Sequence, residues 1–158
     1  MTPNFKTVTA LVSLTSSLPF AEGEARGAIS VALRRRIEEG TTHFICPMRQ
    51  GFELLMAEEV LALRREYPVT LEALIPHELI AADWEEEVRD RFFSAVEMAD
   101  LETLFSTHPF PAVEERCQRL LVRLSNSVIA VGDGPLPPWL RGEDVTLLSP
   151  DDLGRKMA

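Results

Sequence analysis

The residues best suited to bind a ligand lie between Cys46 and Glu53, where an apolar run typical of a strand leads directly into a helix. The first N–H groups of a helix, together with its dipole, favour a phosphate or a carboxylate at that end. The loop contains Pro47, which has no N–H, and Met48, whose Cβ takes space that a glycine would leave for a phosphate. The sequence therefore predicts a nucleotide-type site with a weakened backbone cradle, in which Arg49 supplies positive charge instead.

Three more residues of this loop belong to the candidate site. Gly51 either forms a tight turn that allows close packing of strand and helix, or forms a turn that faces the ligand. Glu53 either accepts a hydrogen bond from a ribose hydroxyl or is simply favoured by the positive end of the helix dipole. We include Gln50, which directly precedes Gly51, among the predicted ligand contacts, together with Met48 and Pro76.

Polar and aromatic residues also lie close to other predicted strands. Thr15, Ser16 and Ser17 follow the first strand, at the edge where open α/β sheets bind ligands, unless they cap the next segment. Trp84 either stacks on a base or serves as a core or lid aromatic. Asn126 precedes the fifth strand and is either part of a turn or a ligand contact. These positions extend the predicted site along the carboxyl edge of the sheet.

Metal chemistry has little support in the sequence. His77 and His108 both follow strands, and a strand order of 3-2-1-4-5 places them three strand spacings apart, about 14 Å at about 4.8 Å each. Cys46 can join only one of them, which leaves too few ligands for zinc. The acidic run from Asp83 to Glu87 is typical of a solvated helix start. We therefore predict no metal site and no resident cofactor, and the chain contains no Gly-x-Ser-x-Gly elbow.

Composition limits the classes of partner. The chain has 158 residues, 46% of them apolar, which suffices for one core that buries roughly 70% of the extended-chain surface. Its 16 basic and 25 acidic residues give a net charge of −9, which disfavours nucleic acid as a partner. No basic leader precedes an apolar stretch, and no apolar run approaches the roughly 20 residues of a membrane helix. We expect a cytoplasmic protein without membrane partners, whose two cysteines are free buried thiols.

Strand-like and helix-like segments alternate along the chain. The expected strands are 7–14, 43–46, 69–75, 101–105, 127–131 and 145–148, and the expected helices are 22–39, 52–66, 85–98 and 112–124. This alternation predicts a doubly wound α/β fold, with a mostly parallel sheet of five to six strands and helices on both faces. Residues 1–158 form one domain, of which 135–158 are a shortened, proline-rich terminal segment. Its last short strand is either an edge strand reached by a loop or antiparallel to its neighbour.

With these motifs placed, the chain resembles the SLOG superfamily and is identified as a divergent member of its YpsA-like branch, a group of bacterial Rossmann-like proteins. The resemblance covers about residues 7–134. Pro76 after the third strand and Trp84 eight residues later match the branch, as does the Gly-aromatic-acid end of the second loop. Where the branch has Thr-Gly-His-Arg-Pro after the first strand, this chain has Thr15-Ser16-Ser17-Leu18-Pro19. Its usual Asn-Arg and Ser-Asp pairs appear as Gln118-Arg119 and Ser125-Asn126.

The resemblance implies a Rossmann-like sheet that binds a nucleotide or a nucleotide-derived small molecule across the carboxyl ends of strands one, two, four and five. Arg49 and Arg119 would then meet phosphate, Gly51 and Glu53 would shape the ribose side, and Trp84 would close over the ligand. Related branches include phosphoribohydrolases, so a hydrolase of N-glycosidic or phosphate bonds is a weaker alternative. The Gly-Gly-x-Gly-Thr-x-x-Glu stretch expected of such an enzyme is absent, and we favour binding without catalysis.

A second alternative is a degenerate SLOG fold that serves as a protein-interaction or oligomeric scaffold. It is suggested by the lost glycines and by the missing glycine-rich helix before the last strand. Without that helix, one face near the fifth strand is left open unless Leu136, Trp139 and Leu140 or another subunit cover it. We therefore also predict a homo-oligomer.

Overall fold

The computed structural model describes residues 7–15 and 22–154, so Ser16 and Ser17 of the predicted site lie outside the described residues. The elements are β1 (Thr7–Ser13), α1 (Glu22–Glu38), β2 (Thr41–Cys46), α2 (Phe52–Leu63), β3 (Thr70–His77), α3 (Glu86–Met98), β4 (Leu101–Ser106), α4 (Val113–Arg123), β5 (Ser127–Val131), the 3-10 helix η1 (Pro138–Leu140) and β6 (Val145–Leu148). Each expected strand and helix is present. In the part of the chain that is described, no helix is both long and apolar enough to cross a membrane.

The six strands form one sheet in the order β4-β3-β2-β1-β5-β6, and every neighbouring pair is parallel. The α/β class is confirmed, but the expected order 3-2-1-4-5 is wrong, because β4 lies outside β3 and not beside β1. The first three crossovers all step in one direction along the sheet. The chain reverses only after β4, when α4 brings it back over β3 and β1 to place β5 beside β1.

The last strand resolves the alternative left open by the sequence. β6 is an edge strand, and it runs parallel to β5, from Val145 opposite Val128 to Leu148 opposite Val131. A proline-rich loop containing η1 replaces the helix of a normal crossover. A parallel neighbour is possible because this loop is long enough to return the chain to the other end of the sheet.

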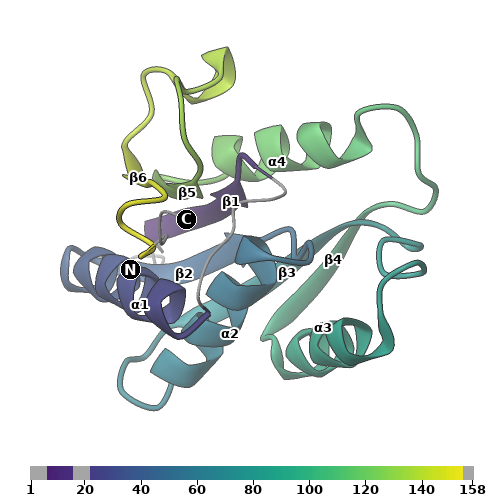
Figure 1. The fold of residues 1–158 in the computed structure, drawn as a ribbon, viewed down its shortest axis with the longest axis horizontal. Coiled ribbons are helices and arrows are strands. Elements are labelled where there is room, and N and C mark those ends of the chain that lie inside the picture. The colour runs from purple at the N-terminus through teal and green to yellow at the C-terminus, as the bar shows by residue number, and fades with distance from the viewer. Residues whose placement is uncertain (1–6, 16–21, 155–158) are drawn as a thin grey trace, which may run out of the picture.

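Helices cover both faces of the sheet unequally (Figure 1). α1, α2 and α3 lie on one face, and α4 lies on the other. Side chains alternate across β1, so that Leu11 belongs to the core beneath α1 to α3, whereas Ala10 and Val12 belong to the core beneath α4. Because both faces are buried, the central strands β1, β2 and β5 are mostly apolar, and the polar residues near their amino ends, such as Thr9 and Ser127, hydrogen-bond to each other.

The face beside β5 is covered from within the chain. Leu140 of η1 is fully buried in the core beneath α4, and Leu136 and Trp139 pack against the same core. The terminal segment thus takes the place of the missing helix. Of the two alternatives given above, cover by Leu136, Trp139 and Leu140 is the one found, so this face does not require another subunit, and the homo-oligomer stays a prediction.

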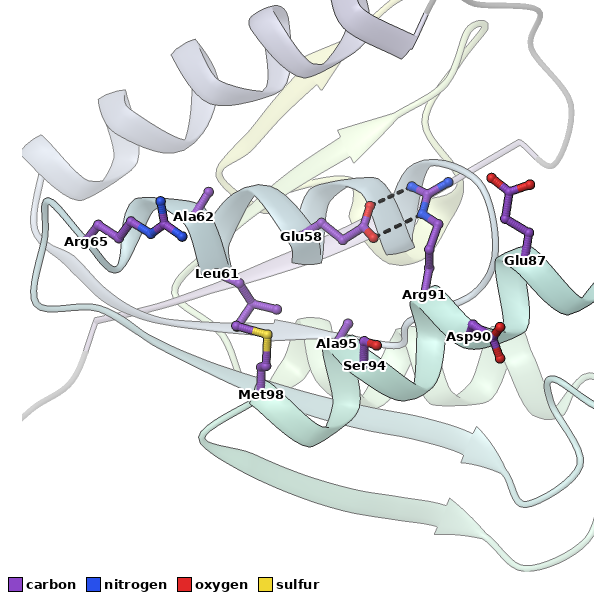
Figure 2. A pocket seen from close by; sticks show the side chains of 10 residues that line it. All are labelled: Glu58, Leu61, Ala62, Arg65, Glu87, Asp90, Arg91, Ser94, Ala95 and Met98. Carbon is purple, nitrogen blue, oxygen red and sulfur yellow. Dashed lines mark hydrogen bonds and ion pairs between the residues drawn. The ribbon is translucent and has the colours of Figure 1, made fainter.

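An ion network joins α2 and α3 to α1, and Figure 2 shows the pair that links α2 with α3. Arg91 of α3 lies across a groove of about 540 Å³ and donates two hydrogen bonds to Glu58 of α2, at 2.6 and 3.1 Å. Arg26 of α1 binds the same Glu58 carboxylate at 3.0 Å. Burial, the largest single effect, raises the pKa of Glu58, but the hydrogen bonds and charges of the two arginines outweigh it and lower that pKa below its usual value. The network fixes α3 against α2.

Replacing Glu58 tests this network. Because the pKa of Glu58 is lowered in the folded state, its stabilising effect is complete above its unfolded pKa and is lost as the pH falls through the folded value. At neutral pH, Glu58→Gln should lower the free energy of unfolding by about 0.5–1 kcal/mol, the range for partly exposed pairs. In acid the variant and the parent should converge. Urea unfolding at several pH values measures the difference, with Glu87→Gln in the same groove as the control. A difference that does not change with pH would contradict this account.

Candidate ligand-binding site

Two adjoining hollows lie at the carboxyl end of β1 and share Ser13, Thr15 and Arg49. The Trp139 hollow, of about 450 Å³, extends toward η1 and is also lined by Gln118, Asp133 and Trp139. The Trp84 hollow, of about 550 Å³, extends toward β3, with Gly51, His77, Asp83 and Trp84 in its lining. We call the two together the Arg49 cleft. β1 lies where the order of the strands reverses, which is the position at which open α/β sheets bind ligands.

Beneath the cleft, the Glu53 carboxylate is fully buried and receives five hydrogen bonds. One oxygen accepts from the backbone N–H of Ser13 at 2.9 Å, from Gln118 Nε2 at 3.0 Å and from Arg49 Nη2 at 2.7 Å. The other accepts from the Arg49 backbone N–H at 3.1 Å and from Arg49 Nε at 2.8 Å. A carboxylate can be buried only with such compensation. Glu53 therefore provides the anion that this strand-to-helix corner favours.

The loop before α2 owes its shape to two residues with positive φ. Met48 has φ 67° and Gly51 has φ 97°, a region that glycine adopts easily and methionine rarely does. The Met48 side chain is completely buried in the core beneath α1 to α3, so it does not fill the cleft. Gly51 caps α2 without a side-chain hydrogen bond and remains exposed in the Trp84 hollow. The loop thus turns Arg49 back over the first turn of α2.

Arg49 is the cation at the centre of the cleft. Burial, the largest effect, lowers its pKa, but the hydrogen bonds and charges of Glu53 and Glu114 outweigh burial and raise the pKa above its ordinary value. Its guanidinium also donates to the Ser13 carbonyl at 2.8 Å and lies 3.3 Å from a Glu114 carboxylate oxygen. Arg49 is therefore permanently charged and held in one position.

The charge around Arg49 is otherwise negative. Asp83 and Glu114 line the Trp84 hollow, and Glu115 and Asp133 line the Trp139 hollow. Arg49 is the one arginine among the described residues that line the cleft, against four acids. Its charge is already balanced by Glu53. Such a lining disfavours a polyanion and suits hydroxyl and amino groups, which can donate to carboxylates.

The predicted contacts divide into three groups. Thr15, Arg49, Gln50, Gly51 and Trp84 line the cleft. Met48, Glu53 and Pro76 are buried. The remaining two described residues lie elsewhere, since Arg119 is in another hollow, beside Phe105 and Arg123, and Asn126 accepts from Val8 N–H at the amino end of β1. The ligand path across strand four is also wrong, because β4 is the far edge strand.

Gln118 and Ser13 take part in the site although the sequence analysis did not assign them a role there. Gln118 Nε2 donates one hydrogen bond to the Glu53 carboxylate and one to the Ser13 carbonyl, and both hydrogen bonds are buried. The signal for Gln118 was its position on the apolar stripe of α4, with Cys117 and Leu121, because a polar residue on a buried stripe needs a partner. Ser13 acts through its backbone, which no side-chain pattern reveals.

The two thiols and the two histidines near the strand ends do not converge. Burial raises the pKa of Cys117 to about 12 and that of Cys46 well above its usual value, and the Glu53 charge adds to both effects. Both cysteines are free and buried, as predicted. The distance argument for His77 and His108 is wrong, because β3 and β4 are neighbours and His77 is paired with Ser106. Within the described residues, no group of three His, Cys, Asp or Glu side chains is placed to hold a metal ion.

A parallel sheet with helices on both faces, and a cleft where the strand order reverses, defines the protein as a Rossmann-like α/β domain. Residues 25–133, more than half of the chain, match the family model YpsA, which is described as the YspA SLOG family. The chain therefore belongs to the SLOG family, and the resemblance to the YpsA-like branch is confirmed. A comparison with curated proteins found no match.

The buried Glu53 network predicts a large difference between two glutamates that both contact Arg49. Glu53→Gln replaces an acceptor of five hydrogen bonds with an amide that accepts fewer, and leaves Arg49 partly uncompensated. The free energy of unfolding should fall by about 3–5 kcal/mol, as when one member of a buried ion pair is removed. Glu114→Gln, on the exposed side of the same arginine, should lower it by at most about 1 kcal/mol. Urea unfolding followed by circular dichroism measures both values. Similar small losses would show that Glu53 is not the anchor of the loop.

The positive φ of Met48 predicts an inverted order of stability at that position. Met48→Ala and Met48→Gly both remove a buried side chain, at about 2–5 kcal/mol. The glycine variant should nevertheless be the more stable of the two by about 1 kcal/mol, because alanine retains the left-handed strain. Met56, also fully buried but inside α2, is the matched control, and there alanine should be more stable than glycine by about 1 kcal/mol. The same order at both positions would contradict the loop conformation.

Proposed function

We propose that the chain binds a nucleotide-derived small ligand in the Arg49 cleft and recognises chiefly its nucleoside part. The observation that carries the proposal is the position of Arg49, which a buried carboxylate holds at the junction of two hollows. Both hollows fall within the usual range for small-molecule sites, about 300–1,000 Å³. Membership of the SLOG family, with its Rossmann-like domain, agrees with this assignment.

The lining supports a nucleoside more strongly than a polyphosphate. The four acids of the lining can accept hydrogen bonds from ribose hydroxyls and from exocyclic amino groups of a base. The Trp84 ring, in the wall of its hollow, offers a surface for stacking. Each phosphate on the ligand would add repulsion from the same acids, with Arg49 as the opposing charge. We therefore assign Arg49 to one acceptor group of the ligand and not to a triphosphate.

Calorimetry and thermal shift with matched nucleosides, monophosphates and triphosphates test the proposal. A ligand present at about 100 times its Kd should raise the Tm by about 5–10 °C. The nucleoside should bind at least as tightly as the monophosphate, and the triphosphate should bind most weakly. The only two tryptophans of the chain line different hollows, so Trp84→Phe and Trp139→Phe each isolate the fluorescence of one of them. No response to any compound at millimolar concentration would overturn the proposal.

A charge variant separates recognition by the cleft from nonspecific effects. Asp83→Asn combined with Glu114→Gln removes two negative charges from the Trp84 hollow. The affinity for the monophosphate relative to the nucleoside should then rise by about three- to tenfold. The control is Glu87→Gln combined with Asp90→Asn, which removes the same charge from the groove between α2 and α3 and should leave the ratio unchanged. An equal change in both double variants would assign the effect to net charge.

A further inference from the structure

β4 is a free edge of the sheet and lacks most of the usual protection against pairing with another strand (Figure 1). Its sequence, LETLFS, contains no proline and no lysine, and Leu101 and Leu104 are 51% and 41% exposed. Edge strands of this kind readily accept a further strand, which is why most proteins blunt them. The opposite edge, β6, is shorter and its residues are less exposed.

Beside β4 lies a mainly apolar hollow of about 360 Å³, bordered by α3, with Glu78, Arg89 and Glu102 also in its lining. Its lining includes Phe93, Val96, Leu104 and the buried Ile80. Phe93 is 56% exposed although it is a large aromatic side chain. Exposed apolar side chains therefore continue from the edge strand onto the neighbouring helix, forming a single surface, which we call the β4–α3 surface.

We propose that two copies of the chain associate through the β4–α3 surface about a two-fold axis, with their β4 strands paired antiparallel. A two-fold axis makes each contact occur twice, so the surface must complement itself. In an antiparallel pair, side chains that lie directly opposite each other are on the same side of the sheet, so the axis passes midway between one residue and its own copy. The test of the proposal is therefore whether one choice of axis brings compatible residues together.

An axis at Leu104 satisfies this condition for the strands. Leu104 is then opposite its own copy, on the side of the sheet that carries α3, because its partner in β3 is Ile75 of that core. Glu102 falls opposite the uncharged Ser106, and Thr103 falls opposite Phe105. No like charges meet across the pair. An axis at Thr103 would instead place Glu102 against Leu104, which is less favourable.

The proposal further places the two-fold axis beside Phe93, which gives charge complementarity between the two copies of α3. Arg89, Phe93 and Glu97 are four residues apart in turn, so they form one stripe along the helix. Arg89 and Phe93 line the same hollow as Leu104, which places this stripe toward the free edge. With Phe93 beside its own copy, Arg89 of each chain lies next to Glu97 of the other, twice. Within the described residues, neither side chain forms an ion pair in its own chain, so both are available.

The proposal is independent of ligand binding in the Arg49 cleft. The cleft is centred on β1, and two strands separate β1 from β4. Among the large exposed apolar residues, Phe93 and Leu104 belong to the β4–α3 surface, and neither lines the cleft, although the buried Ile80 lines both the Trp84 hollow and the hollow beside β4. A dimer that binds no ligand would support the dimer proposal and contradict the proposed function. A monomer that binds a ligand would do the reverse.

Charge reversal tests the pairing of Arg89 with Glu97. Sedimentation velocity over a range of concentrations should show a monomer–dimer equilibrium for the parent protein. Arg89→Glu and Glu97→Arg should each weaken dimerisation at least about tenfold, because each places two pairs of like charges together. The double variant, Arg89→Glu with Glu97→Arg, should return the dimerisation constant to within about threefold of the parent. Circular dichroism confirms that each variant is folded.

Two further variants locate the surface. Leu104→Lys should produce a monomer, because an outward lysine blocks edge pairing. Glu87→Arg reverses a charge on the same helix but in the groove that faces α2, and it should leave the mass unchanged. A parent protein that is monomeric at every concentration would overturn the proposal. A dimer that survives Leu104→Lys and both single charge reversals would also overturn it, since the interface would then lie elsewhere.

Discussion

The rest of the site depends on the burial of one negative charge, the Glu53 carboxylate. An unpaired carboxylate in this position would be destabilising by several kcal/mol, so its five donors must all be in place. They come from the end of β1, from the loop after β2 and from α4, three segments that are far apart in the sequence. The charge therefore holds these three segments together, and the cleft is the space that remains above them.

This arrangement explains how the strand-to-helix corner can keep its shape without the glycines typical of the YpsA-like branch. A glycine-rich loop leaves its N–H groups open to an external anion, whereas here the Arg49 N–H is already bound to Glu53. The positive φ of Met48 is unfavourable, and burial of its side chain in the core offsets that strain. Since the internal carboxylate already occupies the position of an anion, the groups left to a ligand are the outer edge of Arg49 and a ring of acids.

The sequence predicted the elements well because the spacing of apolar residues is a local property, and the continuous apolar run of β5 is buried on both faces as its pattern indicated. It did not predict the strand order, because a right-handed crossover obeys the same local rules in either direction. That choice depends on α3 packing against α2, which involves Arg91 and Glu58, and charged residues at a helix surface do not identify their partners. Similarly, the sequence analysis chose Arg119 as a ligand contact because of its charge. Successive residues of a helix point about 100° apart, and the neighbouring Gln118 is the one that faces inward.

The position at which the chain reverses also separates the two surfaces to which we assign roles. If the reversal came after β3, the fourth strand would lie beside β1 and its carboxyl end would help to form the cleft. Because it comes after β4, that strand contributes nothing to the cleft and becomes an edge, where its N–H and C=O groups on one side lack a partner strand. The sheet itself is a rigid connection between the two surfaces, and neither α3 nor β4 contributes to the Glu53 network. The two surfaces nevertheless adjoin at Ile80, which lines both the Trp84 hollow and the hollow beside β4, so a ligand that displaces Ile80 would shift the monomer–dimer equilibrium.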